Sequence, residues 1–263
     1  TAIIKRGEKY MGEANDYSYN IASVEKTTRL IELLAETNGE LSVLQIAKRL
    51  DTHSSSADRF LITLQNLGYV EKDEHTGKYR LTDRLLKIAS NLITNHPLTV
   101  RYLDVMHTLA YNFKATTHIM AFYDLSTITI HKDLQTQNIS YNNAFFDPKR
   151  QHYCSAPGKL LLSTLSEKSL SEYLSNMKFI KYTNKTIVSE KALRENLELI
   201  RELGYSVHDE EWLSGCLTIA FPLRVHGQIK GAMSVMCSID RKDEMLSQRT
   251  LEGIKRMLAE PNV

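Results

Sequence analysis

Apolar positions recur at helical spacing through the N-terminal part of the chain, after a start in which they show little periodicity. Residues 1–20 are polar with little periodicity, which predicts a flexible N-terminal arm. From residue 23 the apolar side chains share one helical face as far as Asn38-Gly39, a pair that favours a helix end. A second short helix is predicted to begin after Ser42, and a third begins with three serines and stops at Gly68.

Two short strands follow these helices in the stretch YVEKDEHTGKYRL, with a turn predicted at Thr76-Gly77. Only the letters DTH separate the second and third helices. Two helices joined by so short a turn, and followed by a hairpin, predict a winged helix-turn-helix over residues 21–81. A further amphipathic helix is predicted to link this domain to the rest over residues 82–97, where Asn95-His96-Pro97 ends it.

The remaining residues, 98–263, mix helices with strands that come in adjacent runs. Helices are predicted near 98–113, from Ser155, and over 191–203 and 243–259, and strands in TTHIMAFYD, TITIHKD and near 205–209, 216–225 and 229–238. Because strands follow one another directly, the pattern predicts an α+β module and not a doubly wound parallel sheet. A chain of 263 residues therefore divides into two domains.

Composition narrows the class of protein without identifying it. The chain carries 33 Lys and Arg against 31 Asp and Glu, so a nucleic-acid role depends on where the cations cluster. Three cysteines, Cys154, Cys216 and Cys237, fit a reducing compartment better than a disulfide framework. No apolar run reaches the length of about 18 residues needed for a membrane span. The start has no apolar secretion signal either, so we expect a cytoplasmic protein.

Longer motifs occur in both halves of the sequence. The N-terminal half contains SVEKTTRLIELLAE, LSVLQIAKRLDTHSSSADRFLITLQNLGYV and GKYRLT, and the C-terminal half contains CSAPGKLLL and GYSVHDEEWLSGCLTIAFPL. In these stretches, and over residues 21–260, the chain resembles the IclR family of bacterial transcription regulators. The resemblance implies a winged helix-turn-helix that binds DNA, a GAF-like domain that binds a small-molecule effector, and a homodimer or homotetramer.

The third helix of a winged helix-turn-helix enters the major groove with its N-terminal residues facing the bases. Small serines let the backbone come close, and the planar guanidinium of Arg59 offers two parallel donors to guanine or phosphate. The wing and a helix N-terminus add phosphate contacts. The predicted DNA contacts are Ser42, Ser54, Ser55, Ser56, Asp58, Arg59, Lys72, Lys78 and Arg80.

Each of these residues also has an ordinary structural interpretation. Ser55 and Asp58 have the spacing of a capping box, so both could merely cap the helix. Asp58 stands where the family usually has a non-acidic residue. Because a carboxylate repels phosphate, Asp58 would either cap the helix or accept a hydrogen bond from a cytosine amino group. The wing cations could be charges that protect an edge strand, and capping alone explains Ser42.

A regulator needs a ligand that binds two states of the protein differently. CSAPGKLLL offers a helix N-terminus as a seat for a carboxylate. The resemblance places the effector pocket at Ser155, Ala156, Gly158, Asp209, Glu210, Thr218, Ser234 and Met236. The family often has cysteine at the position of Thr218 and serine at that of Met236. Methionine is larger and less polar than serine, which argues against a small keto acid as the effector and leaves a sugar acid or another polar metabolite.

These pocket residues have alternatives of their own. Asp209 and Glu210 could be surface charges at the end of a strand, and the three cysteines could simply be small core residues. His131 is either a ligand contact or a histidine satisfied within its strand. The sequence alone leaves both interpretations open.

An enzyme is the alternative that the residues support least. His152 and Cys154 are predicted to face one side of a strand, as a base and its nucleophile do, but no third group is predicted to orient them. Ser155-x-x-x-Lys159 is one residue too long for the S-x-x-K motif. No P-loop, dinucleotide fingerprint or zinc spacing is present. We therefore expect no catalytic residue, metal or cofactor.

The function predicted from the sequence is that of a DNA-binding transcriptional regulator, with repression as the expected sign. Its partners are double-stranded DNA with a pseudo-palindromic operator, and a small-molecule effector. The second hypothesis is a protein-interaction or signalling module whose winged domain does not read DNA.

Overall fold

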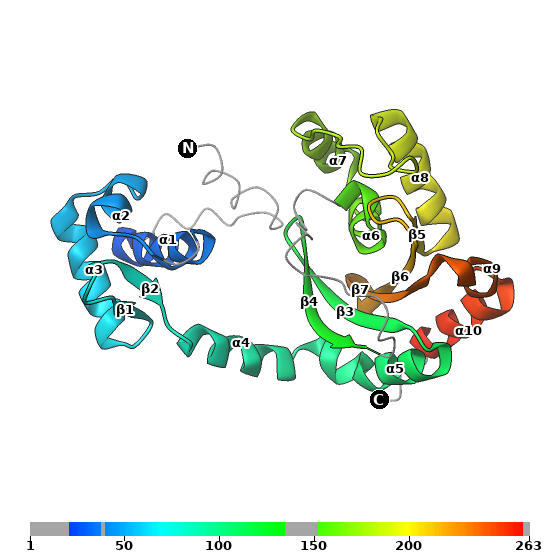
Figure 1. Ribbon diagram of the computed structural model, residues 1–263, viewed down its shortest axis with the longest axis horizontal. Helices are drawn as coiled ribbons and strands as arrows, with labels where there is room; N and C mark the ends of the chain where they lie inside the picture. The colour runs from blue at the N-terminus through cyan, green and yellow to red at the C-terminus, as the bar shows by residue number, and fades with distance from the viewer. Residues whose placement is uncertain (1–20, 38–39, 135–151, 260–263) are drawn as a thin grey trace. The chain divides into compact units, whose positions relative to one another are not determined.

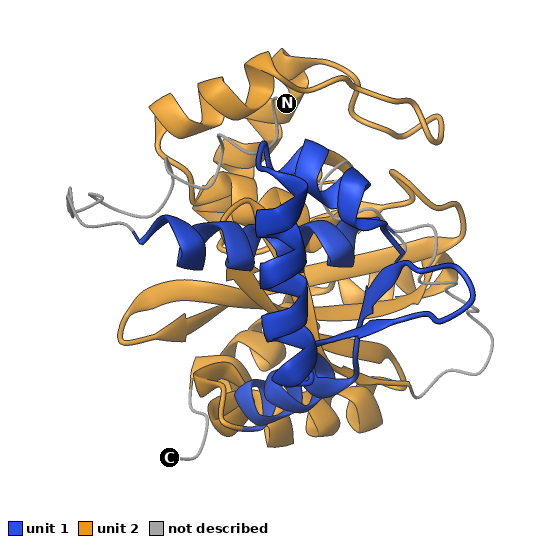
Figure 2. Cartoon of the chain, turned by 90° about the vertical axis from the view of Figure 1, so that its left-hand side faces the viewer, with its two compact units in different colours: residues 1–94 blue, residues 95–263 orange. Residues whose placement is uncertain are grey.

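The structure, a computed structural model, describes residues 21–37, 40–134 and 152–259 of the chain. It divides into two compact units, unit 1 up to Thr94 and unit 2 from Asn95 (Figure 2). Each unit has a hydrophobic core of its own. The predicted flexible arm and the predicted helix end at Asn38-Gly39 lie outside the described residues.

Unit 1 is a winged helix-turn-helix followed by one more helix (Figure 1). Its elements are α1 (Ala22–Glu36), α2 (Val43–Arg49), α3 (Ser54–Asn66), β1 (Val70–Lys72), β2 (Tyr79–Leu81) and α4 (Arg84–Thr94). β1 and β2 form an antiparallel ribbon, the wing, in which Val70 pairs with Leu81 and Lys72 with Tyr79. This order confirms the winged helix-turn-helix predicted from the apolar pattern.

The core of unit 1 is built from the apolar faces of its first three helices. Leu30 of α1, Ile46 of α2 and Leu61 of α3 are completely buried. Leu41, just before α2, forms an isolated bridge to Tyr79 and so ties the wing to the helices. Burying one such side chain contributes about 1.5–3 kcal/mol to stability. The core therefore fixes one side of α3 and leaves its other side to solvent.

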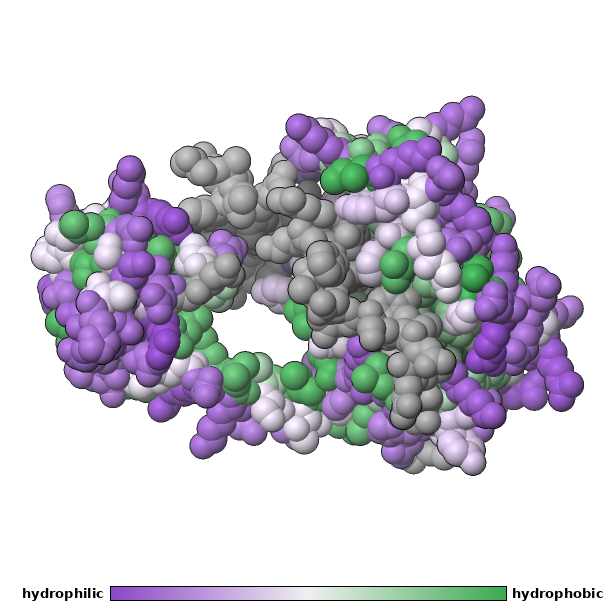
Figure 3. All heavy atoms as spheres, in the orientation of Figure 1, coloured by the Kyte–Doolittle hydropathy of each residue, from purple (hydrophilic) through white to green (hydrophobic). Residues whose placement is uncertain are grey.

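α4 is amphipathic, yet none of its residues is buried. Leu86, Ile88 and Leu92 expose 68%, 39% and 66% of their surface. The space-filling view shows hydrophobic atoms along this helix (Figure 3). Contiguous exposed apolar surface of this kind marks places where a protein meets a partner. α4 lies within residues 82–97, the range predicted for a linker helix, and ends before the next helix begins at Pro97.

Unit 2 is built on one five-stranded antiparallel sheet with the strand order β4-β3-β7-β6-β5. The strands are β3 (Thr116–Tyr123), β4 (Ser126–Asp133), β5 (Ser206–Asp209), β6 (Cys216–Val225) and β7 (Gln228–Ser238). The helices are α5 (Pro97–Phe113), α6 (Ala156–Ser163), α7 (Glu167–Ser175), α8 (Glu190–Leu203), α9 (Lys242–Met245) and α10 (Gln248–Ala259), with short 3-10 turns η2 (His152–Cys154) and η3 (Ile239–Arg241). The predicted α+β class is confirmed.

Alternation of side chains along the strands gives this sheet two different faces. One face carries large residues such as Ile219 and Phe221, which pack with residues of α5 and α10. The other face carries the small residues Ala220 and Ala232, which pack with residues of α6, α7 and α8. Small side chains let α6 lie close to the sheet, where it contacts β5, β6 and β7.

Three features of unit 2 differ from the sequence prediction. The helix expected over residues 243–259 is two helices, because the Ser247 hydroxyl accepts the N–H of Thr250 and caps α10. Residues 152–154, expected on a strand, form the turn η2. α7, whose nine residues bury only Leu170 and Leu174, was not predicted.

Candidate DNA-binding and effector-binding sites

The N-terminus of α3 is exposed and has no capping side chain. His53 occupies the cap position without a side-chain hydrogen bond, and its carbonyl accepts the N–H groups of Ser56 and Ala57. The N–H groups of Ser54 and Ser55 therefore point beyond the end of the helix. Such groups, together with the helix dipole, attract anions such as a DNA phosphate. The first turn contains no acid that would oppose one.

The structure contradicts the interpretation of Ser55 and Asp58 as a capping box. Both residues lie inside α3, whose cap position is His53, so neither can fill that role. Ser55 is exposed near the tip of the helix, and Asp58 is half-buried one turn further on. Acceptance of a hydrogen bond from a base remains as the prediction for Asp58.

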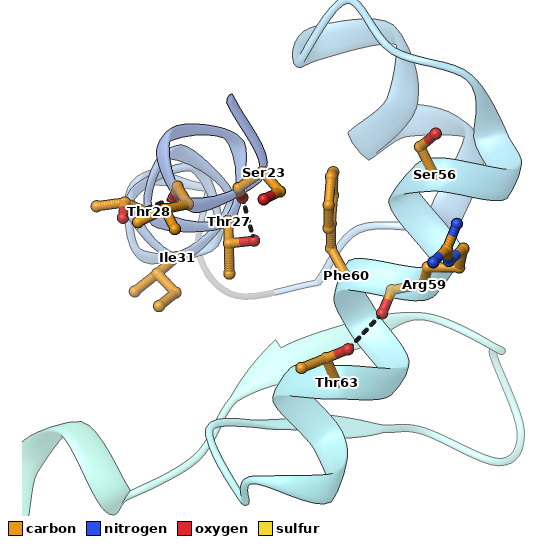
Figure 4. A pocket seen from close by; sticks show the side chains of 9 residues that line it. Ser23, Thr27, Thr28, Ile31, Ser56, Arg59, Phe60 and Thr63 are labelled. Carbon is orange, nitrogen blue, oxygen red and sulfur yellow. Dashed lines mark hydrogen bonds between the residues drawn. The ribbon is translucent and has the colours of Figure 1, made fainter. Parts of the chain in front are cut away.

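Ser56 and Arg59 lie at the border of a gap between α3 and α1. They line a groove of about 530 Å³ between the two helices, together with Ser23, Val24, Thr27, Thr28, Ile31, Phe60 and Thr63 (Figure 4). Arg59 is exposed, and no described acidic side chain forms an ion pair with it. Its guanidinium is therefore available to a base or a phosphate.

Ser42 caps α2 as the sequence predicts. Its hydroxyl oxygen accepts the N–H of Gln45 at 3.3 Å, and the Gln45 side chain accepts the N–H of Ser42 at 2.9 Å. These two bonds complete a capping box. The proton of the Ser42 hydroxyl can still be donated to a phosphate, so capping and a DNA contact are compatible.

The three cations of the wing, Lys72, Lys78 and Arg80, differ in the interactions that they already make within the protein. Arg80 donates to the carboxylate of Glu71, which lies directly across the ribbon, at 2.6 Å. Lys72 lies over the ring of Tyr79, 5.7 Å from its centroid, and Lys78 is half-buried. An exposed ion pair is worth about 0–1 kcal/mol. Arg80 can therefore exchange Glu71 for a phosphate with little loss, and both interpretations of the wing remain.

Thr218, Ser234 and Met236 share the face of the sheet that α6 covers. Thr218 pairs with Met236 between β6 and β7, and Ser234 lies on the same face two residues earlier in β7. The three side chains are buried. The same rows extend to His208 on β5 and to His118 on β3. Ser234 Oγ lies 3.1 Å from His118 Nδ1, so the structure brings these polar groups together.

His118 and His208 are the members of this face that sequence reasoning missed. Alternation along each strand is a signal in the sequence, but the register that sets His118 opposite Ser234 and His208 opposite Thr218 comes from the structure. Desolvation lowers the pKa of His118 to about 4 and the pKa of His208 to about 3, so both rings are neutral near pH 7. Neutral imidazole offers one donor and one acceptor. Nδ1 of His208 has no hydrogen-bond partner within the described part of the chain.

Ser155, Ala156 and Gly158 form the buried start of α6 and leave few donors for a ligand. The Ser155 hydroxyl accepts the N–H of Gly158 at 3.2 Å, and Pro157 has no N–H. A Cβ on Gly158 would lie 2.4 Å from the Cα of His152, so close packing against η2 requires this glycine. Of the backbone donors predicted to bind a carboxylate here, the N–H of Ala156 remains.

Asp209 and Glu210 do not join the other predicted pocket residues. Asp209 pairs with Leu217, whose side chain belongs to the core on the opposite face of the sheet. Lys185 lies 3.0 Å from the Asp209 carboxylate and 2.6 Å from that of Glu210, and Lys242 lies 2.7 Å from Asp209. Although desolvation opposes them, hydrogen bonds from the two lysines hold the pKa of Asp209 below its usual value. The geometry therefore favours ion-paired groups at the sheet edge.

A buried ion pair between Lys159 of α6 and Glu211 lies near His208. Lys159 Nζ donates to Glu211 Oε1, and the two side chains are 1% and 9% exposed. Burial lowers the pKa of Lys159 and raises that of Glu211, and the attraction between the two charges opposes both shifts. Removing one partner of such a pair typically costs about 3–5 kcal/mol. The pair therefore fastens α6 to the segment that follows β5.

The described residues do not support an enzyme. His152 and Cys154 lie in η2, and desolvation raises the pKa of the Cys154 thiol to about 12, so a thiolate nucleophile does not form near neutral pH. His131 Nε2 lies 3.1 Å from the Thr99 hydroxyl of α5, on the face away from Ser234. Its structural interpretation is therefore favoured over a ligand contact.

The remaining sequence expectations concern cysteines, metals and membranes. Cys154, Cys216 and Cys237 are all buried, and none of them forms a disulfide within the described part of the chain. Among residues 21–37, 40–134 and 152–259, no three His, Cys, Asp or Glu side chains are grouped so that they could hold a metal ion. None of the described helices has both the length and the apolar character to cross a membrane.

Comparison with known families separates the two functional hypotheses. Residues 23–74 match the family described as the IclR helix-turn-helix domain, and residues 90–260 match the one described as Bacterial transcriptional regulator IclR C-terminal. The chain belongs to the IclR family. The resemblance drawn from the sequence motifs is thus confirmed, and the protein is a DNA-binding transcriptional regulator.

Relatives of this IclR-family chain are regulators by name. The chain is 29% identical to HTH-type transcriptional regulator KdgR of Escherichia coli strain K12 over 205 residues, which cover 78% of this chain and 77% of that protein. It is 27% identical to Transcriptional repressor IclR of the same organism, with 82% and 79% covered. Because the relatives are regulators, the expectation that the chain is not an enzyme is confirmed.

A solved structure of the IclR family shows the same fold. An IclR homolog from Microbacterium hydrocarbonoxydans, solved in complex with 4-hydroxybenzoate, matches with a TM-score of 0.66 at 20% identity. The match covers 90% of this chain and 99% of that one. The match supports the fold, and the family models divide the chain into a helix-turn-helix domain and a C-terminal regulator domain.

Proposed function

We propose that this protein is a cytoplasmic, sequence-specific repressor that releases its operator when a small polar metabolite binds in unit 2. One observation carries the DNA-binding half of this proposal: α3 presents an exposed N-terminus without a capping side chain, with Ser54, Ser55 and the exposed Arg59 beside it. Small hydroxyl groups and a guanidinium at the start of such a helix suit the major groove of double-stranded DNA.

The predicted DNA contacts divide into those that read bases and those that hold phosphates. Ser55 and Arg59, on the exposed side of α3, reach the base edges. The backbone N–H groups at the helix start, the Ser42 hydroxyl and the wing cations bind phosphates and fix the register of the protein on the duplex. Ser56 and Asp58, which are half-buried, contact the duplex only where it lies closest to the helix.

Two copies of the chain act together on one operator. α4 supports this assembly, because Ile88 and Leu92 lie one turn apart on its apolar face and both are exposed. A two-fold homodimer requires a pseudo-palindromic operator, with half-sites one helical turn or a multiple of it apart. A homotetramer would combine two such dimers.

The effector binds on the face of the sheet that α6 covers. Thr218, Ser234 and the neutral ring of His118 provide hydrogen-bonding groups there, and Met236 adds an apolar contact. His208 Nε2 already accepts the N–H of Trp212, so this ring offers its Nδ1–H as a donor. The nearby cation, Lys159, is already engaged by Glu211. These groups suit a small carboxylate or sugar acid whose oxygens are recognised mainly by neutral partners. Release of DNA follows if the effector binds the DNA-free state more tightly.

The salt dependence of duplex binding tests the DNA-binding half of the proposal. A protein that neutralises phosphates releases counterions, so log affinity is expected to fall by about 0.9 per phosphate contact for each tenfold rise in salt. Fluorescence anisotropy with a labelled duplex measures the slope. A slope near zero, or no binding at any salt concentration, contradicts the proposal and favours a protein-interaction module.

Two measurements on one set of ligands test the proposal that an effector binds unit 2 and releases DNA. Sugar acids and small carboxylates are screened for a rise in the Tm of the protein and for release of the bound duplex. A ligand that raises Tm and weakens DNA binding is the expected result. A ligand that raises Tm but tightens DNA binding contradicts release by effector.

A further inference from the structure

Ile62 is the feature of α3 that the proposed function leaves unexplained. The side chain lies midway along the helix and is 47% exposed. Its neighbour Leu61 is buried in the core of unit 1, and Phe60 packs against that core, whereas Ile62 does neither among the described residues. A β-branched side chain also has a lower helix propensity than a straight-chain polar one. Neither packing nor helix formation accounts for an isoleucine here.

The position of Ile62 on the helix places it on the side expected to face DNA. Successive residues of an α-helix are about 100° apart. On that spacing, one exposed stripe of α3 consists of Ser55, Arg59, Ile62 and Asn66. The stripe lies opposite the buried residues of the helix, Ala57, Leu61 and Leu64. Ile62 is therefore an isolated apolar group between Arg59 and Asn66, on the surface that carries the predicted base contacts.

We propose that Ile62 reads the C5-methyl group of a thymine in each operator half-site. The inference rests on the proposed function, because it requires α3 to lie in the major groove. The thymine methyl is the apolar group that base pairs expose in that groove, beside the hydrogen-bonding edges that polar side chains read. Contact between it and an aliphatic side chain removes both from water.

Charge favours DNA over a second copy of the chain as the partner of this stripe. Arg59 belongs to the stripe, and the exposed N–H groups at the start of α3 lie at its end. The acid beside it, Asp58, is half-buried. An anionic duplex complements this surface, whereas a two-fold contact through it would bring Arg59 against its own copy.

Replacing thymine by uracil removes the methyl group and leaves base pairing unchanged. The test uses the full chain and a duplex of the sequence that the protein selects from a random library, with each thymine of the half-site replaced in turn. At one position the affinity is expected to fall about fourfold per half-site, the effect of exposing one methyl-sized apolar group. Ile62→Ala is expected to bind the thymine duplex about fourfold more weakly and to bind both duplexes equally.

Two further variants separate the methyl contact from a general effect on folding. Ile62→Val keeps a branched aliphatic group and is expected to retain discrimination between thymine and uracil. Ile180→Ala is the matched control, because Ile180 is 46% exposed and lies in unit 2. It is expected to leave both the affinity and the ratio unchanged. Alanine favours helices, so circular dichroism is expected to show Ile62→Ala folded.

Two results would overturn the proposal. One is wild-type protein that binds thymine and uracil duplexes equally at every position, and the other is Ile62→Ala protein that discriminates as strongly as wild type. Both leave specific operator binding intact, which distinguishes them from failure of the proposed function. If no sequence is selected from the library at all, both proposals fail together.

Discussion

At the tip of α3, the size of the side chains matters as much as their chemistry. Ser54 and Ser55 extend no further than one hydroxyl, so a phosphate can reach the N–H groups at the helix start. Arg59, one turn further on, carries a planar fork that matches the edge of a guanine. The helix start therefore sets the position of the protein on DNA, and the longer side chains carry the sequence information.

Arg59→Ala is expected to weaken operator binding by about 1–3 kcal/mol, the usual effect of losing a bidentate contact to guanine. Fluorescence anisotropy with labelled operator measures the change in Kd. Arg249→Ala removes another exposed arginine, from α10 in unit 2, and is expected to leave Kd unchanged. An unaltered Kd for Arg59→Ala would remove this residue from the recognition surface.

Two histidines on the α6 side of the sheet make unit 2 sensitive to mild acid. The pKa is about 4 for His118 and about 3 for His208, against an ordinary value of 6.5. Because the folded state takes up these protons less readily than the unfolded state, the stabilisation is complete above pH 6.5 and is lost as pH falls towards those values. The expected loss is about 1.4 kcal/mol per pH unit for each histidine.

Chemical denaturation at pH values from 7 down to 4.5 measures this dependence. His118→Asn and His208→Asn are each expected to flatten it. His226→Asn is the control, because His226 is exposed and its left-handed φ of 49° suits asparagine, so the wild-type slope should be kept. Wild-type stability that stays constant over this range would contradict the assignment of two desolvated neutral rings.

His208 shows why the candidate effector site could be predicted only in part. The family resemblance placed Asp209 and Glu210 in the pocket, but β5 directs Asp209 towards Lys242 and Lys185, on the other side from His208. Alternation along β5 is visible in the sequence. The register that sets His208 opposite Thr218 is not, because it depends on how two strands with a loop between them align.

At the scale of elements, the sequence predicted best the helices whose ends carry their own signals. Ser42 and Ser155 cap α2 and α6 as expected, because a serine accepts the N–H three residues later without help from the rest of the fold. The break at Ser247 escaped detection, since the apolar spacing runs on through it. α3 begins after His53, whose side chain makes no cap bond, so side-chain capping signals could not mark that start.

The exposed apolar face of α4 leads to a prediction about self-association. Ile88→Glu combined with Leu92→Glu places two charges on its exposed apolar face and is expected to weaken self-association by several kcal/mol, since like charges would meet across a two-fold axis. Sedimentation equilibrium measures the dissociation constant. Ser90→Glu combined with Thr94→Glu adds the same charge to the polar face and is expected to have little effect. Equal dissociation constants for the two pairs would place the interface elsewhere.

At the scale of the whole molecule, the DNA-binding and effector-binding functions belong to units joined by a short covalent connection. Only Asn95 and His96 lie between α4 and α5. The His96 ring accepts the N–H of Leu98 at 3.2 Å and so caps α5. A change in unit 2 on effector binding thus has a short path to the helix that we propose pairs two DNA-binding units.

The two-fold assembly predicts a strict dependence on the spacing of operator half-sites. Insertion of about five base pairs between them turns one half-site to the opposite side of the duplex, so a dimer engages only one. Most of the affinity is expected to be lost, and an insertion of about ten base pairs should restore more of it than five. Electrophoretic mobility shifts measure both. Equal affinity for every spacing would indicate independent monomers.

Selection from a library of random duplexes, at two salt concentrations, tests the central claim most directly. If α3 reads sequence and two copies act together, one pseudo-palindrome is enriched at both salt concentrations, and Arg59→Ala protein enriches it less. Binding without enrichment would show phosphate attraction alone, and absence of binding would leave the winged unit without a DNA partner. Either result would contradict the account.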